Sequence, residues 1–176
     1  MQLSSLKGSR LTIGSFPAFS YNACGGGGKA TLIPSKKKNI LYLIFSSKTF
    51  AIPPLTSQTT KFLSLPLPPG LKIEMSMYIL EGTIDKNSGE VLFTFESKFI
   101  FSIGTIIKFP CLLVKTSLQT GTVKGKLLEG KGRVLQTNGN RKLVGIAIIP
   151  PTGNNILDTF LGLPNVALAE LECEIK

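Results

Sequence analysis

The side chains able to do acid–base or nucleophilic chemistry in this sequence are few. No histidine occurs in the 176 residues, which removes the commonest general base, the usual metal ligand and the base partner of a Ser or Cys nucleophile. The carboxylates most worth considering as acids are Glu96, Glu129 and Asp158. Each of them also fits a solvated strand face, a turn or the polar side of a helix. We therefore expect no enzyme activity and no cofactor.

Cysteines and glycines offer no recognisable site. Cys111 and Cys173 are 62 residues apart, which matches neither a zinc site nor a redox dithiol, so we expect no metal and two buried free thiols, with a disulfide between them as the alternative. Four glycines at 25–28 precede Lys29 and superficially resemble a phosphate-binding loop. The leading Gly and the Ser or Thr of that motif are missing, so we discard this interpretation.

Charge is distributed unevenly along the chain. Residues 1–73 hold nine Lys or Arg and no Asp or Glu, whereas residues 74–176 hold eleven Lys or Arg and ten Asp or Glu. The net charge of +10 therefore belongs almost entirely to the first segment. A basic, acid-free stretch rich in Ser and Thr is typical of an organellar import sequence, which does not have to fold. We expect 1–73 to be a transit peptide and disordered leader and 74–176 to be a single β domain.

The leader also indicates a compartment. It contains a single Arg, which disfavours an Arg-rich mitochondrial presequence and favours the chloroplast. We expect the stroma or the stromal face of the thylakoid, with the mitochondrion as the alternative. The apolar run 40–45 follows three lysines and imitates an export signal, which keeps the thylakoid lumen open as well. A start of translation at Met75 or Met77 would leave the compartment undefined.

Alternation with a period of two predicts strands throughout 74–176. Apolar side chains share one face along 91–101 and again along 167–175, as in half-buried strands. Asn138-Gly139 is suited to a tight hairpin, and glycines at bends favour a small antiparallel β-barrel over a sandwich. A capped apolar segment predicts one short helix near the C-terminus, over 154–161. The predicted strands, about seven or eight, are 77–84, 91–102, 105–108, 112–119, 122–128, 131–135, 142–149 and 166–175.

Phenylalanines offer an apolar surface inside such a barrel. A barrel of about eight strands can enclose one small ligand, and the same side chains can equally fill a solid core. The candidates for an apolar ligand lining are Phe93, Phe95, Phe99, Phe101 and Phe109.

Six cations within 19 residues could form an interaction patch. Such a patch suits an acidic protein face, anionic lipid or RNA. This stretch lacks the aromatic side chains on which single-stranded RNA stacks, which disfavours nucleic acid. Solvated strand faces explain the same charges. The patch residues are Lys124, Lys126, Lys131, Arg133, Arg141 and Lys142.

Three functions remain open after these exclusions. The first expectation is a non-catalytic chloroplast auxiliary protein, an interaction module that aids assembly or stability of a photosynthetic membrane complex at the thylakoid. Its partners would be proteins, with peripheral membrane contact. The alternative is a small lipophile-binding barrel, which could carry an isomerase-like or cyclase-like activity. The third is a plastid RNA-binding protein, for which the charge distribution gives the weakest support.

Overall fold

The computed structural model describes residues 1–35, 37–134 and 140–176. The chain is built almost entirely of antiparallel strands, with a short helix, α1 (Asn155–Leu161), near the C-terminus. The strands are β1 (Gln2–Ser5), β2 (Ser9–Ile13), β3 (Phe19–Tyr21), β4 (Gly27–Pro34), β5 (Ile40–Phe45), β6 (Thr60–Phe62), β7 (Leu65–Pro66), β8 (Leu71–Asp85), β9 (Val91–Ile103), β10 (Ile107–Lys108), β11 (Leu112–Gln119), β12 (Thr122–Lys124), β13 (Glu129–Lys131), β14 (Asn140–Ile149) and β15 (Asn165–Ile175).

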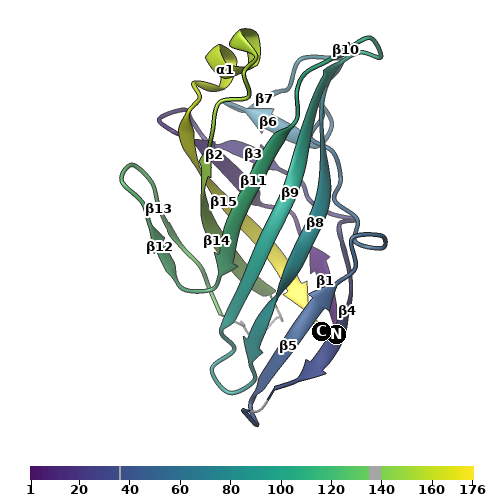
Figure 1. Cartoon of the computed structure of the whole chain (residues 1–176), viewed down its shortest axis with the longest axis vertical. Helices are drawn as coiled ribbons and strands as arrows, with labels where there is room; N and C mark the ends of the chain where they lie inside the picture. Colours follow the sequence, from purple (N-terminus) through teal and green to yellow (C-terminus); the bar gives the residue numbers. More distant parts are fainter. Residues whose placement is uncertain (36, 135–139) are drawn as a thin grey trace.

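Eight of these strands close into a barrel. Their order is β1-β4-β5-β8-β9-β11-β14-β15, and β15 pairs back onto β1. The two ends of the chain therefore meet, and Figure 1 shows both termini at the end of the barrel opposite α1. Closure leaves the ring without free edges, so every ring strand has one face toward the interior. The expected barrel with one short C-terminal helix is confirmed.

The wall is extended at the α1 end by the β2-β3-β6-β7 series. The last residues of β15 pair with β1, whereas its first half pairs with β2 on the same edge. β3, β6 and β7 follow outward from β2. The backbone of Leu55 then exchanges two 2.9 Å hydrogen bonds with Ile73 of β8. The barrel is thereby walled by more chain segments at the α1 end than at the end with the termini (Figure 1).

The strands predicted for 74–176 correspond to β8 to β15, with shifts of boundary. Long strands agree best, for example 91–102 with β9 and 142–149 with β14. β12 and β13 form a separate two-stranded hairpin outside the ring. The proposed Asn138-Gly139 hairpin lies outside the described residues.

Helix α1 forms where its caps predict it. The Asn154 side chain accepts a 3.0 Å hydrogen bond from the Leu157 amide at the start, and Gly162 ends the helix with φ 63°. Such an N-cap and a left-handed residue after the last turn satisfy backbone groups that the helix leaves free. In the described part of the chain no helix is long and apolar enough to cross a membrane.

The N-terminal segment differs from the disordered leader that its composition predicts. The described residues among 1–73 form β1 to β7 and the start of β8, and β1, β4 and β5 are three of the eight ring strands. The expected boundary at residue 73 lies inside β8. The transit peptide and the compartment stay predictions that rest on the composition of residues 1–73.

The glycine run at 25–28 serves the closure of the ring. Gly27 has φ +123° and faces β1 so closely that a Cβ would lie 2.0 Å from the Leu3 carbonyl oxygen. Only glycine allows two backbones to approach in this way. The run that imitates a phosphate loop is therefore the place where β4 meets β1.

The interior contains two groups of buried side chains. The first, which we name the lower core, lies toward the termini and includes Leu3, Leu43 and Phe93. The second, the upper core, lies against α1 and includes Phe101 and Leu161. A bulge in β8 between Met77 and Ile79 lets both Met77 and Leu80 point into the lower core.

Removing residues 1–73 tests whether the C-terminal segment is a domain by itself. We expect residues 74–176 to lose cooperative unfolding, because the ring loses three strands and leaves two long edges unpaired. Urea titration followed by circular dichroism, with the full chain as control, measures this. A sharp transition of the fragment would contradict the expectation and would support processing at residue 73.

A second prediction concerns ring closure at Gly27. We expect Gly27→Ala to lower the free energy of unfolding by about 2–4 kcal/mol, because the added methyl group must displace backbone. Gly25→Ala is the matched control, since Gly25 also has a positive φ but a Cβ there meets nothing within 4 Å. The control should cost about 1 kcal/mol. Equal losses in urea titrations of the two variants would show that the close approach is unimportant.

Candidate functional site

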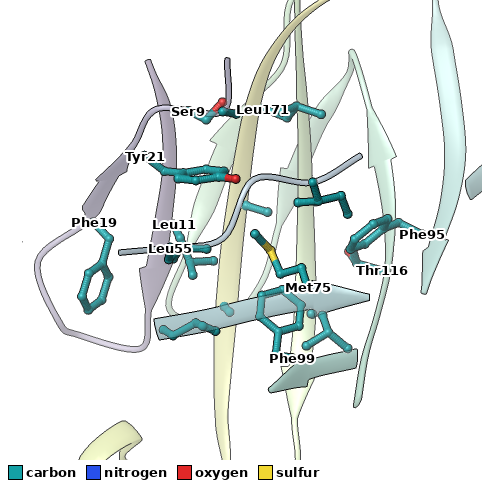
Figure 2. A pocket seen from close by; sticks show the side chains of 18 of the residues that line it. Ser9, Leu11, Phe19, Tyr21, Leu55, Met75, Phe95, Phe99, Thr116 and Leu171 are labelled. Carbon is teal, nitrogen blue, oxygen red and sulfur yellow. The ribbon is translucent and has the colours of Figure 1, made fainter. Parts of the chain in front are cut away.

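A cavity of about 210 Å³ lies inside the barrel. It touches both the lower and the upper core, and its wall is almost wholly apolar. Figure 2 shows Met75 and Phe99 in the middle of the view, with Tyr21 on one side and Phe95 on the other. These side chains come from β8, β9 and β3, so strands far apart in sequence enclose one space.

The exposure of the inward side chains shows that the space is open. Met75, Phe95, Phe99, Val114 and Leu171 line the cavity and are each only half-buried. Side chains in the lower core, such as Phe93, are fully buried. Part of the interior is therefore not filled by the protein's own atoms, in contrast to the dense packing of a usual core.

Small residues on two adjacent strands explain why this part of the barrel is hollow. On β14, Gly145 and Ala147 face the interior, and their register partners on β15 are Ala169 and Ala167. Four adjacent inward positions thus carry at most one methyl group each. The large side chains of β8 and β9 cannot reach across to this wall, and space remains between them.

A larger residue in place of Gly145 would clash with the neighbouring strand. A Cβ there would lie 2.5 Å from the Ser117 carbonyl oxygen and 2.8 Å from the Thr116 hydroxyl. The Thr116 hydroxyl itself donates a 2.8 Å hydrogen bond to the Ile146 carbonyl. The close approach of β11 to β14 therefore requires glycine at position 145, independently of the space that this residue leaves in the cavity.

The Tyr21 and Ser9 hydroxyl groups in the wall already have backbone hydrogen-bond partners. The Tyr21 hydroxyl donates to the Pro53 carbonyl, and burial raises the pKa of Tyr21 to about 12. Ser9 Oγ accepts a 3.2 Å hydrogen bond from the Glu172 amide. Because these groups have backbone partners, an occupant does not need to supply hydrogen bonds to them.

Charge reaches the wall at one place. Arg10 Nε and Glu170 Oε2 lie 4.0 Å apart on paired residues of β2 and β15, and both residues contribute to the cavity lining. Glu170 also forms an ion pair with Lys142. These charges are paired with one another, and the rest of the lining selects for hydrocarbon.

Four of the five phenylalanines proposed as a ligand lining contribute to the cavity. Phe93, Phe95, Phe99 and Phe101 line it, and Phe109 instead packs against the upper core. Sequence reasoning missed the contribution of residues 1–73, which supply Leu11, Phe19 and Tyr21 among others. The period-two pattern Gly145, Ala147 and Ala167, Ala169 was a readable signal, since small residues at inward positions leave room.

The residues of the predicted cationic patch lie in different parts of the structure. Lys124, Lys126 and Lys131 belong to the β12–β13 hairpin, where Lys124 lies 4.0 Å from Glu129. The hairpin pairs with no ring strand, although it packs against β14 and β15.

Two further cations of the patch, Arg133 and Lys142, have acidic partners on β15. Arg133 Nη2 lies 2.7 Å from Glu172 Oε2, and Lys142 pairs with Glu170. The register partner of Lys142 is Glu172, so Lys142 reaches Glu170 diagonally, and Arg133, which pairs with Lys142 in an isolated bridge, lies within reach of Glu172. These charges neutralise one another, which weakens the argument for an anionic partner at this surface.

Arg141 points into the barrel, whereas it was expected to be part of a surface patch. Its side chain is buried, at 5% exposure, opposite Cys173. Nη1 donates a 3.0 Å hydrogen bond to the Ile175 carbonyl, and Nε has no hydrogen-bond partner in the described part of the chain. Burial lowers the pKa of this guanidinium. It lies outside the cavity lining.

The candidate carboxylates lie away from the cavity. Glu96 forms an ion pair with Lys115 on the neighbouring strand, and Glu129 belongs to the β13 hairpin. Asp158 accepts hydrogen bonds from the Thr152 amide and hydroxyl at 2.8 and 2.5 Å. The hydrogen bond from the Thr152 hydroxyl, and to a lesser extent those from backbone amides, lowers the pKa of Asp158. None of the three carboxylates lines the cavity.

The cysteines are all free thiols. Cys173 is buried as expected, and burial raises its pKa to about 12. The expectation of a buried Cys111 is wrong, because Cys111 is exposed just before β11. Within residues 1–35, 37–134 and 140–176, no three Cys, Asp or Glu side chains are placed to hold a metal ion together.

Comparison of the chain with protein-family models, with curated proteins and with solved structures found no significant match. The function is therefore inferred from the cavity and the surface of this chain.

Proposed function

We propose that this protein binds a small apolar molecule inside its barrel. The observation that carries the proposal is the cavity of about 210 Å³ with its apolar wall. Ligand sites are typically concave and mostly apolar with a few polar groups, and the mouths and interiors of β-barrels are common places for them. The chemistry of the wall suits an acyl chain, a terpenoid or another hydrocarbon-like molecule.

The energetic cost of an empty cavity supports this proposal. At about 24 cal/mol per Å³, an unfilled cavity of this size lowers stability by on the order of 5 kcal/mol. That cost is as large as the whole stability of a marginal domain. A bound apolar molecule restores the missing contacts. Because it binds only the folded chain, it raises the free energy of unfolding.

The proposal requires the N-terminal segment. Leu11, Tyr21 and Leu55 line the cavity, so a chain that begins at residue 74 would have an incomplete wall. The chloroplast assembly role stays a prediction that rests on the composition of residues 1–73. RNA binding has lost support, since Arg133 and Lys142 are held in ion pairs and Arg141 is buried.

Replacement of a lining residue by Trp tests the proposal. The chain contains no Trp, so one introduced indole is also a unique fluorophore. Val114 lines the cavity, and its neighbour Leu113 is exposed on the outer face of β11. We expect Val114→Trp to fill the cavity and weaken binding of the uncharged probe N-phenyl-1-naphthylamine at least tenfold, about 1.4 kcal/mol. Leu113→Trp, the matched control, should leave binding unchanged.

Fluorescence titration measures both affinities, and thermal unfolding shows whether the variants fold. Ala169→Leu is a smaller filling change on β15 and should weaken probe binding as well. Equal binding by the wild type, Val114→Trp and Ala169→Leu would show that the probe binds elsewhere. Absence of saturable binding by the folded wild type would also contradict the proposal.

A further inference from the structure

We propose that the α1 end of the barrel docks on the surface of an anionic lipid bilayer. Apolar side chains are exposed there on separate elements that lie at the same end of the barrel in Figure 1: the β6–β7 hairpin, the turn before β10, and α1. We name this set the apical rim. It consists of Leu63, Leu65, Ile106, Ile156 and Phe160.

The exposure of the rim side chains is high for residues of this type. Ile106 is 90% and Leu65 is 69% exposed. Single exposed apolar residues need no explanation, but a group of large ones at one end of a molecule marks an interaction site. The rim side chains come from projecting turns and a short helix rather than from a flat face, a shape that suits insertion between lipid headgroups.

The β6–β7 turn displays its leucine at a conformational cost. Leu63 and Ser64 have φ of 51° and 67°, as in a two-residue hairpin turn that normally uses Asn and Gly. A non-glycine residue in this region costs about 1 kcal/mol or more. The pairing of β6 with β7 holds the turn in this conformation. The exposed Leu63 side chain would gain burial from contact with an apolar environment.

Charge near the rim fits an anionic surface. Lys61 on β6 and Lys108 on β10 are exposed, and no ion pair holds either of them within the described residues. The nearby acid Asp158 is directed into hydrogen bonds with Thr152 and Gly153. Basic side chains around apolar tips attract phospholipid headgroups at about 1 kcal/mol each. A second copy docked through the same end would bring these lysines together, which disfavours a dimer.

The rim is continuous with the cavity. Phe160 is exposed on α1 and also lines the cavity. If the cavity binds an apolar molecule as proposed above, docking at this end would let that molecule pass between bilayer and barrel without crossing water. Only this step depends on the proposed function, since the rim would bind lipid whether or not the cavity is occupied.

Vesicle sedimentation tests the docking. The full chain is mixed with vesicles of phosphatidylcholine containing about one quarter phosphatidylglycerol, and with vesicles of phosphatidylcholine alone. We expect binding to the anionic vesicles that weakens as salt rises. The double variant Leu65→Ser with Ile106→Ser should lower the partition coefficient roughly tenfold or more, because two apolar side chains no longer insert. Leu127→Ser is the matched control: this leucine is 73% exposed in the β12–β13 turn, away from the rim.

The outcomes separate docking from cavity binding. Docking is supported if Leu127→Ser binds vesicles like the wild type while the double variant does not, and if the double variant still binds N-phenyl-1-naphthylamine. Docking is overturned if neither vesicle binds the wild type, or if Leu127→Ser reduces binding as much as the double variant. It is also overturned if the wild type forms a dimer that the double variant abolishes. Val114→Trp should sediment with vesicles normally, so loss of cavity binding leaves this test intact.

Discussion

The pairing of the first strand with the last is the constraint on which the rest of the structure depends. β1 lies between β4 and β15, and Gln2 and Lys176 exchange backbone hydrogen bonds of 2.6 and 3.0 Å. Without β1 the sheet would have two free edges and its inner face would be open to water. The contact is between residues at opposite ends of the chain, so the loop entropy of the whole molecule must be overcome before it forms. Gly27 makes it sterically possible by leaving room for the Leu3 carbonyl.

Once the ring is closed, the sizes of the inward side chains decide what the interior becomes. Leu43, Phe93 and Leu143 fill the end near the termini. Closer to α1, the pairs of Gly145 with Ala169 and of Ala147 with Ala167 have small side chains that leave the space in front of them unfilled. α1 and the strands added by β2 then cover the upper end. The cavity is thus a consequence of small residues on two paired strands within an otherwise well-packed barrel.

The sequence predicted the part of the fold whose pattern is local. β9 and β15 alternate apolar and polar side chains over ten or more residues, and Asn154 with Gly162 marks the helix. Residues 1–73 gave no such signal, because β2 and β3 are too short to show alternation and each also pairs with a strand distant in sequence, β2 with β15 and β3 with β6. Their acid-free composition, typical of an import leader, hid that role. Four of the five proposed lining phenylalanines do line the cavity, since period-two alternation fixes which side of a strand faces inward. For the predicted patch, the sequence could not show that Arg141 faces inward or that Lys142 and Arg133 form ion pairs with Glu170 and Glu172 of β15.

A crystal of the full chain under xenon pressure would show whether the barrel is hollow between Met75, Phe99 and Leu171. Xenon enters apolar cavities that water avoids. We expect strong xenon density among these three side chains, with the surrounding rotamers unchanged. A well-ordered interior in which Met75 and Phe99 pack against Ala169, with no xenon between them, would contradict this expectation.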